Sequence, residues 1–111
     1  MDNLKDIEID DIYTAIDEYI YTVVYFWAPT CGLCRYIGPV FDSLANEYPD
    51  VLFCKINTKE NTDSYTMLGI KGVPTIKFYE DGTTIDTLVG CKDINSMKQI
   101  YKDKIEDLIN G

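Results

Sequence analysis

The feature that most constrains the fold is the run Thr22–Trp27 (TVVYFW), which is β-branched and aromatic throughout. Such a run is typical of a β-strand that is covered on both faces. An apolar stripe with helical period follows and predicts a helix that starts at Cys34 and ends before Pro49. A second strong strand, Val51–Ile56, is expected next. Because a helical crossover returns the chain to the same end of a sheet, these two strands should be parallel.

The rest of the chain predicts further helices and one antiparallel hairpin, whose tight turn is indicated by Asp81-Gly82. The expected elements are a short amphipathic helix (Asp10–Tyr19), a short helical stretch (Asp63–Leu68), two hairpin strands (Thr75–Tyr79 and Thr84–Val89) and a last helix capped by Asp93. A chain of 111 residues has the size of one domain, so we expect a single domain over residues 1–111. The expected class is α/β, with a mixed central β-sheet flanked by helices on both faces.

Charge and composition exclude several functions. Ten Lys and Arg residues stand against nineteen Asp and Glu, which gives a net charge of −9 and disfavours binding to nucleic acid or to anionic membranes. The chain has no histidine, which excludes Ser-His-Asp and Cys-His catalysis and every zinc site that mixes cysteine with histidine. No apolar run is long enough to cross a membrane, and the acidic N-terminus lacks the features of a secretion signal. We therefore expect a cytoplasmic protein.

Four cysteines stand at positions 31, 34, 54 and 91, and only the first two are paired by their spacing. A zinc site would need all four as ligands without a second C-x-x-C, so no metal is expected. Cys54 lies within an apolar strand and should be a small buried thiol. Cys91 follows Gly90, which is typical of a turn, and is expected to be more exposed.

The C-x-x-C motif falls where a buried strand ends and a helix begins. Cys31 is then close to the unpaired N–H groups and the positive dipole of the helix N-terminus, which stabilise a thiolate. Cys34 lies one helical turn further on and can reach the sulfur of Cys31. We expect Cys31 to be the attacking thiol and Cys34 to be the resolving thiol of a disulfide exchange.

Four segments carry a specific family resemblance. The active-site stretch FWAPTCGLCR, the GVPT stretch at 72–75, FYEDG at 78–82 and Gly90 occur in an order and with gaps similar to those of the thioredoxin family. The resemblance runs from about Ile9 to the last helix. It implies a thioredoxin-like fold and a monomeric oxidoreductase that reduces protein disulfides and serves electron transport and redox homeostasis. It implies no cofactor beyond the Cys31–Cys34 disulfide, and recharging by a thioredoxin-reductase-type flavoprotein.

The resemblance also assigns roles around the cysteines. Trp27 would pack beside the disulfide; the less favoured alternative is an ordinary core residue. A cis Pro74 would present the backbone of Val73 to an extended substrate segment, which pairs with it as a strand. Arg35 either favours the Cys31 thiolate or is simply solvated. The full set implied for substrate binding is Trp27, Gly32, Leu33, Gly72, Val73, Pro74 and Gly90.

Position 25 departs from the family pattern, which has a buried acid two residues before the tryptophan. Tyr25 stands there, and a phenol with a pKa of about 10 is a poor base at neutral pH. Lys55, which matches the family's lysine beside that acid, lacks its usual partner if it stays buried; it could then hydrogen-bond Tyr25 or be neutral, and the sequence leaves both open. We therefore expect both residues to modulate the site, with slow resolution by Cys34.

Two further departures lie in the motif and just before it. Leu33 replaces the usual proline and frees an N–H that can stabilise the Cys31 thiolate, which would make the pair more oxidising. Thr30 replaces a second tryptophan and removes apolar contact surface. These changes keep open a dedicated electron donor or a more oxidising glutaredoxin-like or isomerase-like protein. A separate alternative is a redox-silent binding module that uses the Val73–Pro74 groove, and the two intact cysteines argue against it.

Overall fold

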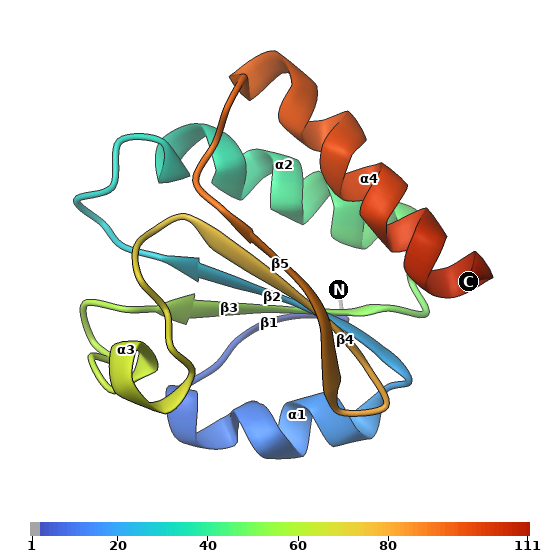
Figure 1. The fold of residues 1–111 in the computed structure, drawn as a ribbon, viewed down its shortest axis with the longest axis horizontal. Helices are drawn as coiled ribbons and strands as arrows, with labels where there is room; N and C mark the ends of the chain where they lie inside the picture. The colour runs from blue at the N-terminus through green and yellow to red at the C-terminus, as the bar shows by residue number, and fades with distance from the viewer. Residues whose placement is uncertain (1–2) are drawn as a thin grey trace.

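The computed structural model describes residues 3–111 and contains one five-stranded mixed sheet in the order β1-β3-β2-β4-β5 (Figure 1). Strand β2 is parallel to β3 and antiparallel to β4, and β4 and β5 form an antiparallel hairpin. The parallel pair and the hairpin expected from the sequence are therefore confirmed. The strands are β1 (Leu4–Asp6), β2 (Tyr21–Trp27), β3 (Leu52–Asn57), β4 (Thr75–Glu80) and β5 (Thr83–Val89).

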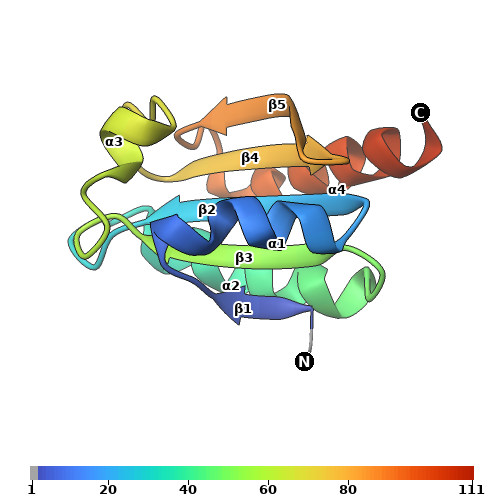
Figure 2. The same cartoon turned by 90° about the horizontal axis from the view of Figure 1, so that it is seen from below.

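Helices cover both faces of this sheet. Figure 1 shows α2 and α4 above it and α1 and α3 below it, and the view from below in Figure 2 places α1 across β2 and β3. The helices are η1 (Ile9–Asp11), α1 (Ile12–Glu18), α2 (Cys34–Glu47), α3 (Ser64–Met67) and α4 (Ile94–Asn110). This arrangement is the expected α/β class. Within residues 3–111, none of the helices combines the length and the hydropathy that a bilayer crossing requires.

The sheet separates two apolar cores. Alternate residues of β2 enter them: Val23 and Tyr25 pack under α2 and α4, whereas Val24 and Phe26 pack against α1. All four side chains are at most 2% exposed. The TVVYFW run is thus covered on both faces, and β2 is held rigidly up to the point where the cysteine motif begins.

Strand β1 was not expected from the sequence. Its three residues pair in parallel with Phe53–Lys55 of β3 and extend the sheet at its edge. Asn3, which precedes it, is buried, and its amide nitrogen lies 2.8 Å from the carbonyl oxygen of Ala45 and 3.1 Å from that of Val51. This amide ties the beginning of the described chain to the end of α2.

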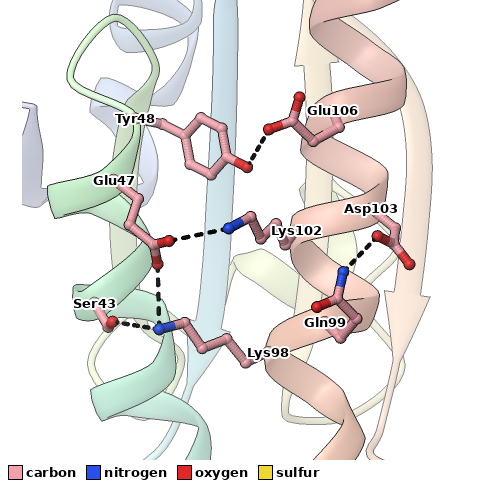
Figure 3. Close-up of polar contacts among 8 residues, drawn as sticks. All are labelled: Ser43, Glu47, Tyr48, Lys98, Gln99, Lys102, Asp103 and Glu106. Atoms are coloured by element: carbon pink, nitrogen blue, oxygen red, sulfur yellow. Dashed lines mark hydrogen bonds and ion pairs between the residues drawn. The ribbon is translucent and has the colours of Figure 1, made fainter.

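Polar side chains join α4 to α2 along their exposed sides (Figure 3). Glu47 lies 3.2 Å from the ammonium groups of both Lys98 and Lys102. The hydroxyl of Tyr48, just beyond α2, donates a 2.6 Å hydrogen bond to Glu106. Exposed ion pairs contribute little each, but together they fix the C-terminal part of α2, whose first residue is Cys34.

Candidate active site

Cys31 and Cys34 lie at the end of the sheet where β2 stops and α2 starts (Figure 1). They form a disulfide with their Cα atoms 5.3 Å apart. The backbone N–H of Cys31 donates to the carbonyl of Ala28 at 3.1 Å, which closes the turn after β2. Cys34 is the first residue of α2, so the pair sits at a helix N-terminus as the sequence predicts.

The two cysteines differ in exposure. Cys34 is 7% exposed, whereas Cys31 is only half-buried, so an incoming disulfide meets Cys31 first. The N–H of Cys34 donates to the Sγ of Cys31 at 3.2 Å. Once the pair is reduced, this N–H and the helix dipole stabilise a thiolate on Cys31. In this oxidised structure the N–H that contacts the sulfur belongs to Cys34 and not to Leu33, the donor expected from the sequence.

A shallow groove borders the disulfide and brings several expected site residues together. It is lined by Trp27, Ala28, Pro29, Cys31, Cys34 and Arg35. Trp27 is half-buried against the core beneath α2 and α4, and its Nε1 has no hydrogen-bond partner among residues 3–111. Arg35 is exposed, as are Gly32 and Leu33 in the turn between the cysteines.

The peptide bond between Val73 and Pro74 is cis, as expected. Phe26 at the end of β2 pairs with Thr75 of β4, which brings the preceding Pro74 to the level of Trp27. On the other side, the N–H of Gly90 donates to the carbonyl of Pro74 at 2.8 Å. Gly90 has a φ of 76°, a left-handed conformation that glycine adopts without strain. Val73 packs against the core cluster that Cys31 also contacts.

Tyr25 lies directly beneath the motif. It is 2% exposed, and its hydroxyl donates to the backbone carbonyl of Cys34 at 3.2 Å. Burial raises the pKa of Tyr25 well above that of a free phenol, and the nearby Tyr101 and Asp42 raise it further. The phenol is therefore neutral near pH 7 and acts as a hydrogen-bond donor to the Cys34 backbone.

Lys55 pairs with a residue that was not expected from the sequence. Its Nζ lies 2.8 Å from a carboxylate oxygen of Asp42 on α2, and its side chain is 21% exposed. The expectation that Lys55 bonds Tyr25 was wrong, because α2 crosses this face of the sheet and supplies an acid instead. Asp42 was missed by the sequence analysis. The available signal was its position next to Phe41, which belongs to the buried stripe of α2.

The remaining cysteines are free thiols. Cys54 is fully buried, and burial raises its pKa to about 12. Cys91 is half-buried one residue after Gly90. In the part of the chain that the structure describes, no group of three or more residues is placed to hold a metal ion.

A half-buried cysteine at a helix N-terminus, a buried partner three residues on and a cis-proline loop at the same end of the sheet define a thiol–disulfide exchange protein. The family model for thioredoxin matches residues 10–103. The chain therefore belongs to the thioredoxin family. It is a protein-disulfide oxidoreductase that exchanges dithiol for disulfide through Cys31, the nucleophile, and Cys34, the resolving thiol, with no cofactor.

Individual relatives agree with this family. Thioredoxin 1 of Synechococcus elongatus is 42% identical over 76 residues, which cover 68% of this chain and 71% of that protein. A chloroplastic M-type thioredoxin of Pisum sativum is 39% identical over 88 residues, which cover 78% of this chain but only 49% of that protein.

Solved structures show the same fold. A mutant thioredoxin from Halobacterium salinarum superposes with a TM-score of 0.78 at 25% identity and covers 92% of this chain and 90% of its own. Thioredoxin from Plasmodium falciparum gives a TM-score of 0.79 at 26% identity, covering 89% of this chain and 97% of its own.

Proposed function

We propose that this protein is a cytoplasmic, monomeric electron carrier that reduces protein disulfides and is itself reduced by a thioredoxin-reductase-type flavoprotein. The observation that carries the proposal is the half-buried Cys31, whose sulfur accepts the N–H of the buried Cys34. Free thiols at Cys54 and Cys91 fit a reducing compartment.

The disulfide exchange proceeds through two successive nucleophilic attacks on sulfur. The Cys31 thiolate attacks one sulfur of the substrate disulfide, and the other substrate sulfur leaves as a thiolate and takes up a proton. Cys34 then loses its proton, and its thiolate attacks the Sγ of Cys31. The second substrate sulfur leaves, and the Cys31–Cys34 disulfide is formed. Two electrons have passed to the substrate, and the reductase returns two electrons and two protons to the cysteine pair.

Substrate binding is assigned to the surface beside the cysteines. An extended segment would pair with the backbone of Val73, which the cis bond to Pro74 presents, and Gly72 and Gly90 would allow its close approach. Trp27, Gly32 and Leu33 would contact the segment around the disulfide.

Tyr25 and Lys55 are proposed to modulate the second attack. Because the pKa of Tyr25 is raised and its hydroxyl already donates to the Cys34 carbonyl, Tyr25 does not accept the Cys34 proton at neutral pH. Lys55 is engaged by Asp42. The proton of Cys34 therefore passes to solvent, and resolution is slow compared with a site that holds a buried carboxylate.

The test uses the protein, reduced with dithiothreitol and freed of reductant, and insulin as the disulfide substrate. The wild type should reduce insulin, Cys31→Ser should be inactive, and Cys34→Ser should accumulate a mixed disulfide. Cys91→Ser is the matched control for removal of a thiol and should retain activity. Retained activity in Cys31→Ser would contradict the assignment. Turnover with NADPH and a thioredoxin reductase tests the electron donor, and fractionation of the source cells tests the compartment.

A further inference from the structure

Two thiols are free in the part of the chain that the structure describes, and they differ in their access to solvent. Cys54 is fully buried in β3, whereas Cys91 is half-buried in the segment between β5 and α4. The inner side of Cys91 packs against the apolar core beneath α2 and α4. A small solute can therefore reach Cys91 from one side, while the other side of this residue faces the core.

A buried hydroxyl without a partner lies in the core against which Cys91 packs. It belongs to Tyr101 of α4, whose side chain is 2% exposed and whose hydroxyl makes no hydrogen bond within residues 3–111. Burial, and after it the proximity of Cys91, raise the pKa of Tyr101 to about 12. The phenol is therefore protonated near neutral pH and keeps a free O–H donor next to Cys91.

The hydroxyl of Tyr101 is better suited to an oxidised form of Cys91 than to its free thiol. Buried polar groups in folded proteins nearly always have a hydrogen-bond partner, and a phenylalanine would fill the same space without a polar atom. A thiol sulfur is only a weak acceptor. An oxygen atom bound to that sulfur would be a stronger acceptor, and it would lie on the side of Cys91 that faces the core.

The first cysteine oxidation product that carries such an oxygen is a sulfenic acid, which a hydroperoxide forms from the thiolate. The Sγ of deprotonated Cys91 attacks one peroxide oxygen, the O–O bond breaks, and the other oxygen leaves with its substituent and takes up a proton. The sulfur loses two electrons and the peroxide gains them. A thiol reverses the change by attacking the sulfur and releasing water, and a second thiol then restores Cys91.

We propose that Cys91 is a peroxide-reactive modification site whose sulfenic acid accepts a hydrogen bond from the Tyr101 hydroxyl. The site lies outside the exchange between Cys31 and Cys34 and goes beyond the proposed function. Because Cys91 is only partly accessible, the site favours a small oxidant such as hydrogen peroxide. Cys54 has no access to solvent and stays a thiol in the folded protein.

The test uses the oxidised protein, in which Cys31 and Cys34 are joined and the free thiols are Cys54 and Cys91. Hydrogen peroxide is added at neutral pH and then removed with catalase, and dimedone is added at increasing times to trap sulfenic acid. Peptide mass spectrometry gives the labelled fraction of each cysteine. Cys91 should be labelled and Cys54 should not. Absence of dimedone from Cys91, or equal labelling of both cysteines, would overturn the proposal.

Matched tyrosine variants test the hydrogen bond. Tyr101→Phe removes an unpartnered hydroxyl and should fold, and its Cys91 sulfenic acid should disappear about threefold to tenfold faster than that of the wild type. Tyr48→Phe removes a hydroxyl that donates to Glu106 instead and should leave this lifetime unchanged. Equal lifetimes in Tyr101→Phe and the wild type would overturn the proposal. No disulfide substrate is used, so this result is independent of the insulin assay.

Discussion

Replacing Tyr25 with phenylalanine isolates the contribution of one hydroxyl beneath the active site. The ring remains and keeps its contact with Phe41, whose centroid lies 5.2 Å away. The lost interaction is the 3.2 Å hydrogen bond from the Tyr25 hydroxyl to the carbonyl of Cys34. A buried hydrogen bond between neutral groups contributes about 1 kcal/mol to the free energy of unfolding. We therefore expect Tyr25→Phe to be less stable than the wild type by about 1 kcal/mol at pH 7.

The same loss in the free energy of unfolding predicts a lower melting temperature. Unfolding entropy is about 2.1 cal/mol/K per residue, so a chain of 111 residues has an unfolding entropy of about 0.2 kcal/mol/K. A loss of about 1 kcal/mol then lowers the melting temperature by about 4 °C. Calorimetry and urea denaturation of the oxidised protein measure both quantities.

The pH dependence of the free energy of unfolding provides an independent test of the Tyr25 hydroxyl. Burial raises the pKa of Tyr25, so the folded state favours the neutral phenol. The corresponding stability is fully present below the unfolded pKa of about 10 and is lost as the pH rises beyond it. Tyr25→Phe should consequently lose less stability than the wild type between about pH 10 and 11.5. A variant as stable as the wild type at pH 7, with an equal loss at alkaline pH, would refute the structural role of the hydroxyl.

Three further substitutions or modifications test other parts of the account. Tyr25→Asp introduces a base and should accelerate decay of the mixed disulfide at pH 7 by at least about tenfold, although the variant should be less stable. Quenched-flow kinetics that show no acceleration would contradict the argument that the wild type lacks a base for the Cys34 proton. Burial raises the pKa of Cys54 to about 12, so in the reduced native protein iodoacetamide at pH 8 should modify Cys31 and leave Cys54 intact until the protein is denatured; peptide mass spectrometry reveals either pattern. Tyr48→Phe removes the 2.6 Å hydrogen bond to Glu106 and should lower the free energy of unfolding by about 0.5–1 kcal/mol in urea, and an unchanged value would show that this contact does not stabilise α4.

The main elements of the fold could be predicted because their signals are local. The runs that form β2 and β3 are largely apolar, and the turn of the last hairpin places Asp81 and Gly82 at φ angles of 49° and 79°. Such positive values suit the Asp-Gly pair that predicted the turn. Strand β1 could not be predicted in this way, because a strand of three residues depends on pairing with β3 and on the contacts of Asn3 with residues more than 40 positions away.

In the active site, too, features with a local sequence signal could be predicted and features that depend on tertiary packing could not. The cysteine motif and the cis Pro74 follow from sequence spacing together with the family resemblance. The partner of Lys55 does not, because it depends on which side chain of α2 crosses that face of the sheet, and this proved to be Asp42. The donor to Cys31 depends on the turn conformation between the cysteines, which the residue types alone leave open.

The most direct test of the central claim is the reduction potential of the Cys31–Cys34 pair, measured in defined thiol–disulfide buffers with Cys54 and Cys91 replaced by serine. The N–H that contacts Cys31 belongs to Cys34. A proline at position 33 would remove only its own N–H, so this hydrogen bond would be kept. We therefore predict a two-electron couple within about 30 mV of the thioredoxin value of about −270 mV, a margin of about 1.4 kcal/mol. A value of about −200 mV or higher would contradict a role as protein reductant and favour a glutaredoxin-like or isomerase-like protein in which Leu33 stabilises the thiolate.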